Sequence, residues 1–101
     1  MSVHNKLVRD NVPELIPKNG HKVVYHMAGD AEYRIKLRDK LIEECYEFVA
    51  NEKIEQLADV MEVVHALMKF HGFSYEDVDT AIRSKREERG GFEKRVILEK
   101  S

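Results

Sequence analysis

Apolar residues in the middle of the chain recur at the spacing of an α-helix. Between residues 31 and 51 they follow one another at steps of four and three, at Leu37, Leu41, Cys45 and Phe48. This spacing predicts an amphipathic helix with one buried stripe. A second long helix is predicted over residues 53–71, and Gly72 is a favourable residue to end it.

Two shorter helices are predicted outside this central pair. One spans residues 75–88, and Ser74 and Asp77 at its start resemble a capping box, in which each side chain accepts from the other residue's backbone N–H. The other lies near the N-terminus, with Pro13 in its first turn.

Two segments have the β-branched and aromatic residues typical of strands, at residues 22–27 and 93–99. A lone two-stranded ribbon is marginal in water, so we expect these strands to pair and to lie on the helices. The predicted fold is a single all-α domain over residues 1–101, with this ribbon as a minor addition.

The second long helix is apolar over well over half of its circumference, at Ile54, Leu57, Val60, Met61, Val63, Val64, Leu67 and Met68. Such a helix must be covered on several sides. A chain of 101 residues buries a modest fraction of its surface alone and gains from self-association. We therefore expect helices of a second subunit to complete a bundle, with a homodimer as the minimum and a tetramer as the alternative.

The amino-acid composition argues against several classes of function. With 43% hydrophobic and 36% charged residues, the chain is typical of a folded soluble domain. A net charge of −2 gives no general attraction to nucleic acid or to a membrane, and no apolar run has the length of a transmembrane helix. Cys45 is the only cysteine, which excludes an internal disulfide and a thiolate zinc site, and we expect a cytoplasmic location.

Acidic residues are concentrated in one part of the sequence. Seven of the nineteen lie in residues 43–62, where Lys53 is the only base. Like charges one helical turn apart destabilise a helix by roughly 0.2–0.5 kcal/mol per pair. Converging carboxylates are what a hard divalent cation requires, because Mg2+ binds carboxylate and phosphate oxygens. The pattern therefore predicts a metal site.

Helical geometry sharpens this prediction. On the first long helix Glu44 and Glu47 lie at the edge of the predicted buried face, whereas Glu43 is expected on the solvent-exposed back. On the second, a row of acids interrupts the apolar surface at Glu55, Asp59 and Glu62. Such a row would be costly to bury without a cation. The alternative is that these acids face solvent or pair with arginines of other helices.

The two acid pairs lie in a recognisable order. Glu44-x-x-Glu47 followed by Gln56-x-x-Asp59 resembles the E-x-x-E…E-x-x-D signature of the MazG-like all-α nucleoside triphosphate pyrophosphohydrolases, a superfamily that includes the phosphoribosyl-ATP pyrophosphohydrolases. The two ends of the chain, Asn5 to Asp10 and Arg89-Gly90-Gly91-Phe92, resemble a small single-domain house-cleaning branch. The resemblance implies that the four signature positions, which are all acids in that family, bind Mg2+, with Mn2+ as an alternative. It also implies that a non-canonical nucleoside triphosphate is cleaved to a monophosphate and pyrophosphate.

One position departs from the signature. Gln56 replaces an acid and offers one carbonyl oxygen without charge, so Glu62 or Glu55 could substitute for it. The expected metal ligands are Glu44, Glu47 and Asp59, as the resemblance implies, with Gln56 from the signature or Glu62 from the acidic row completing the set. Glu43 or Glu55 could accept the proton of the attacking water. The predicted catalytic residues are Glu43, Glu44, Glu47 and Asp59.

Catalysis at phosphorus also needs cations that neutralise and position the phosphates. The candidates are Lys6, Arg9, Lys40, Arg86, Arg89 and Lys94. For each of these residues taken alone, the alternative to phosphate binding is that it is an ordinary solvated side chain on the surface. Two other functions remain open: a non-catalytic nucleotide-binding or regulatory module, and a purely structural helical dimer. A phosphoribosyl-ATP pyrophosphohydrolase is a variant of the enzymatic hypothesis.

Overall fold

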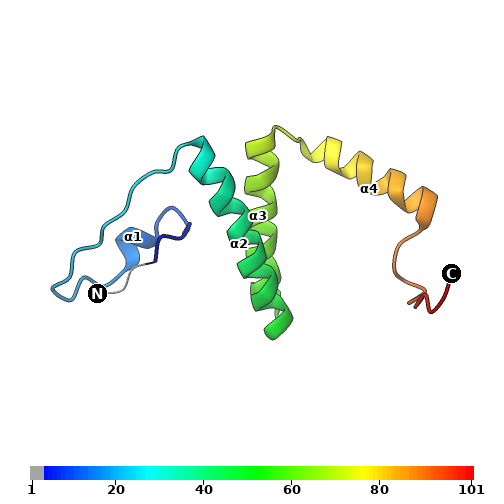
Figure 1. Cartoon of the computed structure of the whole chain (residues 1–101), viewed down its shortest axis with the longest axis horizontal. Helices are drawn as coiled ribbons and strands as arrows, with labels where there is room; N and C mark the ends of the chain where they lie inside the picture. The colour runs from blue at the N-terminus through cyan, green and yellow to red at the C-terminus, as the bar shows by residue number, and fades with distance from the viewer. Residues whose placement is uncertain (1–3) are drawn as a thin grey trace.

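The structure, a computed structural model, describes residues 4–101 and is all-α, as predicted. Its helices are α1 (Val12–Leu15), α2 (Asp30–Ala50), α3 (Ile54–His71) and α4 (Tyr75–Arg89). Figure 1 shows α2 and α3 side by side, with the N-terminal segment and α1 on one side and α4 on the other. Only three residues connect α2 to α3, so the two helices form an antiparallel hairpin. No helix of residues 4–101 combines the length and the apolar character needed to cross a bilayer.

The predicted β ribbon is wrong. Residues 22–27 and 93–99 are both irregular, and no strand occurs anywhere in residues 4–101. The physical reason is their separation, because one segment precedes α2 and the other follows α4 at the opposite side of the molecule (Figure 1). Strand propensity alone does not form a ribbon when no partner lies within hydrogen-bonding reach.

The core lies between α2 and α3 and is small. Its buried apolar side chains are Leu37, Val63 and Met68. Tyr33 of α2 meets Phe70 of α3 edge to face, with ring centroids 5.4 Å apart. Among the residues described, the only buried charged side chain is Glu44, which lies on this same face of α2. The packing of the hairpin thus places an acid at the edge of its core.

The predicted buried stripe of α2 is partly wrong, because Cys45 is exposed. With Leu41 at zero and about 100° per residue, Leu37 and Glu44 lie near 320° and 300°. The face toward α3 is therefore centred on the acidic side of Leu41, and Cys45 lies beyond its opposite edge. This rotation leaves a second apolar row of α2 exposed, at Ile35, Ile42 and Val49.

The corner between α3 and α4 is defined by local hydrogen bonds. Gly72 adopts a left-handed conformation with φ 74°, and the amides of Gly72 and Phe73 bond the carbonyls of Lys69 and Met68. This is the Schellman arrangement that commonly ends a helix. The capping box that was predicted at the start of α4 is confirmed, since Ser74 Oγ accepts from the Asp77 amide at 3.0 Å and Asp77 Oδ2 accepts from the Ser74 amide at 3.1 Å.

Candidate functional site: an acidic cluster on α2

Three carboxylates of α2 converge in the structure. Glu43, Glu44 and Glu47 each place an oxygen within 4.8 Å of the others. Residues one helical turn apart share a face of a helix, which brings Glu47 beside the adjacent pair. We call these three residues the acidic cluster. They combine the first predicted acid pair with Glu43.

Glu44 is the most confined member of the cluster. Its exposed fraction is 7%, and one of its oxygens, Oε1, lies 3.3 Å from Lys40 Nζ. The other oxygen, Oε2, is buried and has no hydrogen-bond partner. Burial raises the pKa of Glu44, and the nearby charges of Glu47 and Asp59 raise it further, although Lys40 opposes the shift. A cation beside Oε2 would favour the charged form of this carboxylate.

Lys40 connects two members of the cluster. Its Nζ donates to Glu43 Oε2 at 3.1 Å in addition to its contact with Glu44. Burial opposes the lysine's charge, but these two acids nevertheless raise the pKa of Lys40. Lys6 lies 3.8 Å from Glu43 Oε1, so the N-terminal segment also reaches the cluster.

The prediction that Glu43 points to the exposed back of α2 is wrong. The side chain is half-buried, at 34% exposure, because the N-terminal segment and Lys40 cover this part of the helix. The sequence contained a signal for the arrangement, since Lys40 precedes Glu43 and Glu44 by three and four residues. Those are the spacings at which helical side chains pair.

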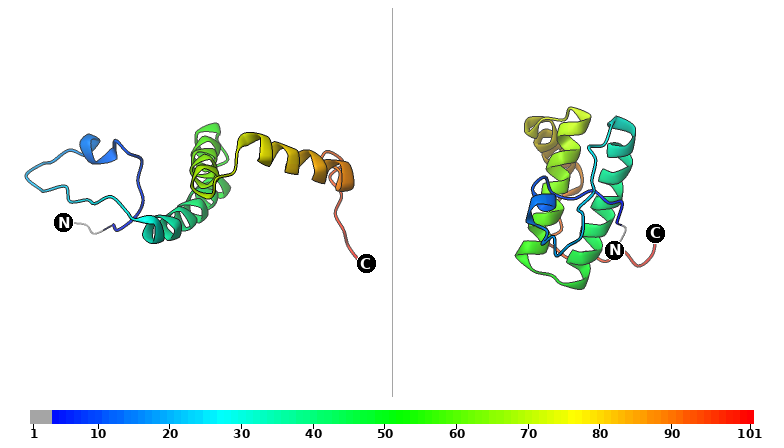
Figure 2. Two further views of the ribbon diagram at one scale, coloured as in Figure 1. Left: turned by 90° about the horizontal axis from the view of Figure 1, so that it is seen from above. Right: turned by 90° about the vertical axis from the view of Figure 1, so that its left-hand side faces the viewer.

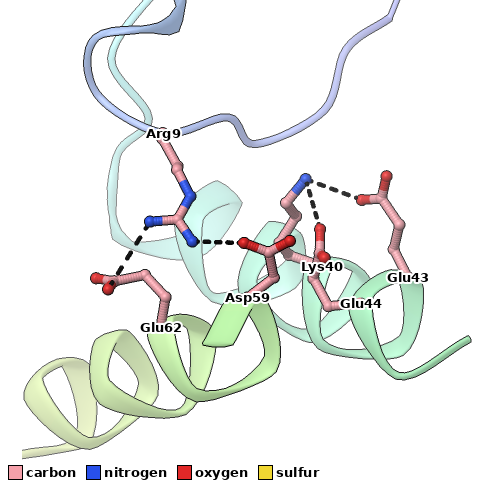
Figure 3. Close-up of polar contacts among 6 residues, drawn as sticks. All are labelled: Arg9, Lys40, Glu43, Glu44, Asp59 and Glu62. Atoms are coloured by element: carbon pink, nitrogen blue, oxygen red, sulfur yellow. Dashed lines mark hydrogen bonds and ion pairs between the residues drawn. The ribbon is translucent and has the colours of Figure 1, made fainter. Parts of the chain in front are cut away.

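The second acid group lies on α3 and is bound by Arg9 (Figure 3). Arg9 donates to Asp59 Oδ1 at 2.7 Å and lies 3.8 Å from Glu62 Oε1. The charge of Asp59 also raises the pKa of Glu44, so Asp59 lies near the cluster of α2, although it is not one of the three converging carboxylates. The alternative for these acids was pairing with arginines of other helices. Asp59 and Glu62 do pair with an arginine, but Arg9 lies in the irregular N-terminal segment and not on a helix.

The remaining predicted residues are distributed differently. Gln56 is half-buried at the first turn of α3, and Glu55 beside it is exposed. Lys94 is exposed in the C-terminal segment. Arg86 and Arg89 lie at the end of α4, where Arg86 bonds Glu93 at 2.7 Å. These last three cations are therefore apart from the acidic cluster of their own chain (Figure 1).

The chemistry of this donor set fits a divalent cation. The network contains five carboxylates and three cations, which leaves a net charge of −2: Glu43, Glu44, Glu47, Asp59 and Glu62 with Lys6, Arg9 and Lys40. All the acidic ligand atoms are oxygens, as Mg2+ and Mn2+ prefer. The unpaired Glu44 Oε2 supplies an oxygen that no protein group satisfies.

Comparison with protein-family models, with curated proteins and with solved structures found no match. The interpretation of the acidic cluster consequently depends on the residues and contacts of this chain.

Proposed function

We propose that this protein binds Mg2+, or alternatively Mn2+, at the acidic cluster and hydrolyses a nucleoside triphosphate to a monophosphate and pyrophosphate. Glu44 and Glu47 would hold the ion, and Asp59 would join them when Arg9 releases it. A non-canonical base is the expected preference. The all-α hairpin and the two groups of acids on facing helices support this proposal.

The observation that supports it most is the buried, unpaired oxygen of Glu44. An unsatisfied polar group in a folded protein costs about 1–3 kcal/mol, and more when it is charged. Exposed acids are common without an ion, but this one is neither exposed nor paired on both oxygens. A bound cation would remove the cost and would offset the repulsion among three neighbouring carboxylates.

Each side chain of this network would have a different role in hydrolysis. A bound Mg2+ would neutralise the phosphates and lower the pKa of a coordinated water. Glu43 lies in the cluster and can accept the proton of the attacking water. The water oxygen bonds to phosphorus, the anhydride bond between the α and β phosphates breaks, and pyrophosphate leaves. Arg9 and Lys6 are positioned to contact the phosphates on the side covered by the N-terminal segment.

A nucleotide panel with measured pyrophosphate release tests the proposal. We expect Mg2+-dependent turnover that chelation abolishes. Glu47→Gln should lower kcat/KM by about 100-fold or more, the scale of losing one electrostatic contact to a transition state. Glu47 is exposed, so its substitution should leave the fold intact. Glu52→Gln is the matched control, because Glu52 lies in the connection between α2 and α3, outside the cluster.

The same panel separates the competing hypotheses. Saturable nucleotide binding without product would indicate a regulatory module, for which Gln56 offers a reason because it adds no charge to the site. Neither binding nor product would indicate a structural helical dimer. Turnover restricted to phosphoribosyl-ATP would assign the phosphoribosyl-ATP pyrophosphohydrolase variant.

A further inference from the structure

The end of α4 contains a cationic hollow that the acidic cluster of the same chain does not reach. Lys85, Arg86 and Arg89 line it together with Glu93, which pairs with Arg86, so the charged lining is net positive. Phe92, which is 96% exposed, also lines it. The hollow is open and has a volume of about 750 Å3. Cations beside an exposed aromatic ring are suited to a nucleotide, because they contact its phosphates while the ring stacks on its base. We call Lys85, Arg86 and Arg89 the cationic end of α4.

The cavity that Glu43 of the acidic cluster lines is far smaller. This cavity, between the N-terminal segment and α2, has a volume of about 50 Å3 and is lined by Lys6, Lys40 and Glu43 among others. This is room for water molecules, whereas sites for small molecules usually enclose about 300–1,000 Å3. Of these two cavities, the small one therefore lies beside the acidic cluster, and the large one lies at the end of α4, where three cations and one acid, Glu93, line it.

The overall shape keeps the two places apart. The radius of gyration is 18.1 Å, compared with about 13 Å for a compact domain of this length. Among the described residues the only extensive helix packing is between α2 and α3. The left view in Figure 2 shows α4 extending away from the hairpin, with the C-terminal segment beyond it.

The corner before α4 opposes a return of α4 onto its own hairpin. Gly72 and Ser74 both have defined hydrogen bonds, and Phe73 is the single residue between them. The ring of Tyr75 also packs edge to face on His65 of α3, with centroids 5.3 Å apart. Folding back would require breaking the Schellman bonds or the capping box, and a cap alone is worth about 1 kcal/mol.

We propose that the cationic end of α4 completes the acidic cluster of a second copy of this chain, so that each active site combines acids from one subunit and cations from the other. This inference rests on the proposed function. Two features favour a second copy as the partner. The acidic network has a net charge of −2, opposite in sign to the cationic end of α4. In addition, α2 exposes an apolar row at seven-residue spacing, Ile35, Ile42 and Val49, which is the spacing of helix–helix association.

Mixing two inactive variants tests the arrangement. Glu47→Gln removes an acid, and the double substitution Arg86→Ala with Arg89→Ala removes two cations. We expect each variant alone to lose at least tenfold in kcat/KM. When they are co-expressed, one site of each mixed dimer contains only intact residues, so about a quarter of wild-type activity should return in random dimers.

Arg83→Ala is the matched control, because Arg83 lies on α4 but pairs with Asp79 outside the hollow. It should retain wild-type turnover. Full activity of the double arginine variant, or no recovery in the mixture, would overturn the shared site. Absence of turnover in the unsubstituted protein would instead count against the proposed function, and a second measurement then decides the inference.

That measurement is cross-linking, which needs no activity. In a Cys45→Ser background, one chain carries Glu62→Cys and another carries Arg89→Cys, and a short bismaleimide is added to their mixture. We expect a covalent dimer from the mixture, and none when Glu14→Cys replaces Glu62→Cys as the control. A single chain with both cysteines that cross-links internally, or a protein that sediments only as a monomer, would contradict the proposal.

Discussion

The α2–α3 hairpin and α4 are ordered by different interactions. In the hairpin, side chains distant in sequence pack together, including Leu37 with the buried residues of α3. In α4 no residue is buried, and the helix is stabilised by its capping box and by the local pair between Asp79 and Arg83. Tertiary packing thus determines the position of the acids, whereas local bonds determine that of the cations. A site that combines the acidic cluster with the cationic end of α4 would need a second chain, as proposed above.

The largest difference between the two regions should appear in leucine substitutions. Leu37→Ala should lower the free energy of unfolding by about 2–5 kcal/mol, because Leu37 is 1% exposed and its loss leaves a cavity. Leu98→Ala is the matched control after α4, where the side chain is 78% exposed, and it should cost within about 0.5 kcal/mol. Chemical denaturation measures both. An equal loss of unfolding free energy in the two variants would show that Leu37 does not belong to a stabilising core.

Removing the cap should act on α4 and leave the hairpin unchanged. Ser74→Ala should destabilise α4 by about 1 kcal/mol, because the Asp77 amide loses its acceptor. Amide hydrogen exchange should accelerate over residues 75–89 and stay constant over residues 54–68. The Ser74 backbone amide lowers the pKa of Asp77 below its ordinary value of 3.8.

The capping box therefore has a definite pH dependence. Its contribution is present above about pH 3.8 and is lost as the pH falls through the lowered pKa of Asp77. Protection of the α4 amides, taken relative to their intrinsic exchange rates at each pH, should fall on acidification through that range. If exchange changes equally in α3, the two helices unfold as one unit and the distinction between them fails.

The smallest effect concerns Glu44. Its pKa is raised, so the contribution of its protonated form to stability is present below the ordinary value of 4.5 and is lost as the pH rises through the raised value. In a chelator, Glu44→Gln should therefore become more stable relative to wild type as the pH rises from about 4.5. Thermal unfolding across pH measures the difference, and Glu52→Gln should show none. A difference that shrinks with rising pH would mean that Glu44 is satisfied in the metal-free protein.

The elements that sequence predicted well are those defined by local rules. The long helices, the glycine that ends α3 and the Ser74–Asp77 capping box follow from periodicity and cap chemistry, and the structure has all of them. Their boundaries fall within one or two residues of expectation.

The predictions that were wrong concern the packing of one element against another. The two apolar segments around residues 22–27 and 93–99 have strand composition. Whether they pair depends on the distance between them in the folded chain, which their composition does not determine. The exposure of Cys45 and the confinement of Glu43 both follow from a rotation of α2 toward its acidic side, which is decided by the partner helix and the N-terminal segment. Of the predicted site, Glu43, Glu44 and Glu47 converge with Lys6 and Lys40, and Asp59 and Glu62 form a second group around Arg9. Arg86, Arg89 and Lys94 lie apart from both groups.

Titration calorimetry with Mg2+ and Mn2+ tests the central claim most directly, that the acidic cluster binds a divalent cation. We predict saturable uptake by the wild-type protein, at least tenfold weaker binding for Glu44→Gln and Glu47→Gln, and unchanged binding for Glu52→Gln. Absence of saturable ion uptake, both alone and with a nucleoside triphosphate present, would contradict the account.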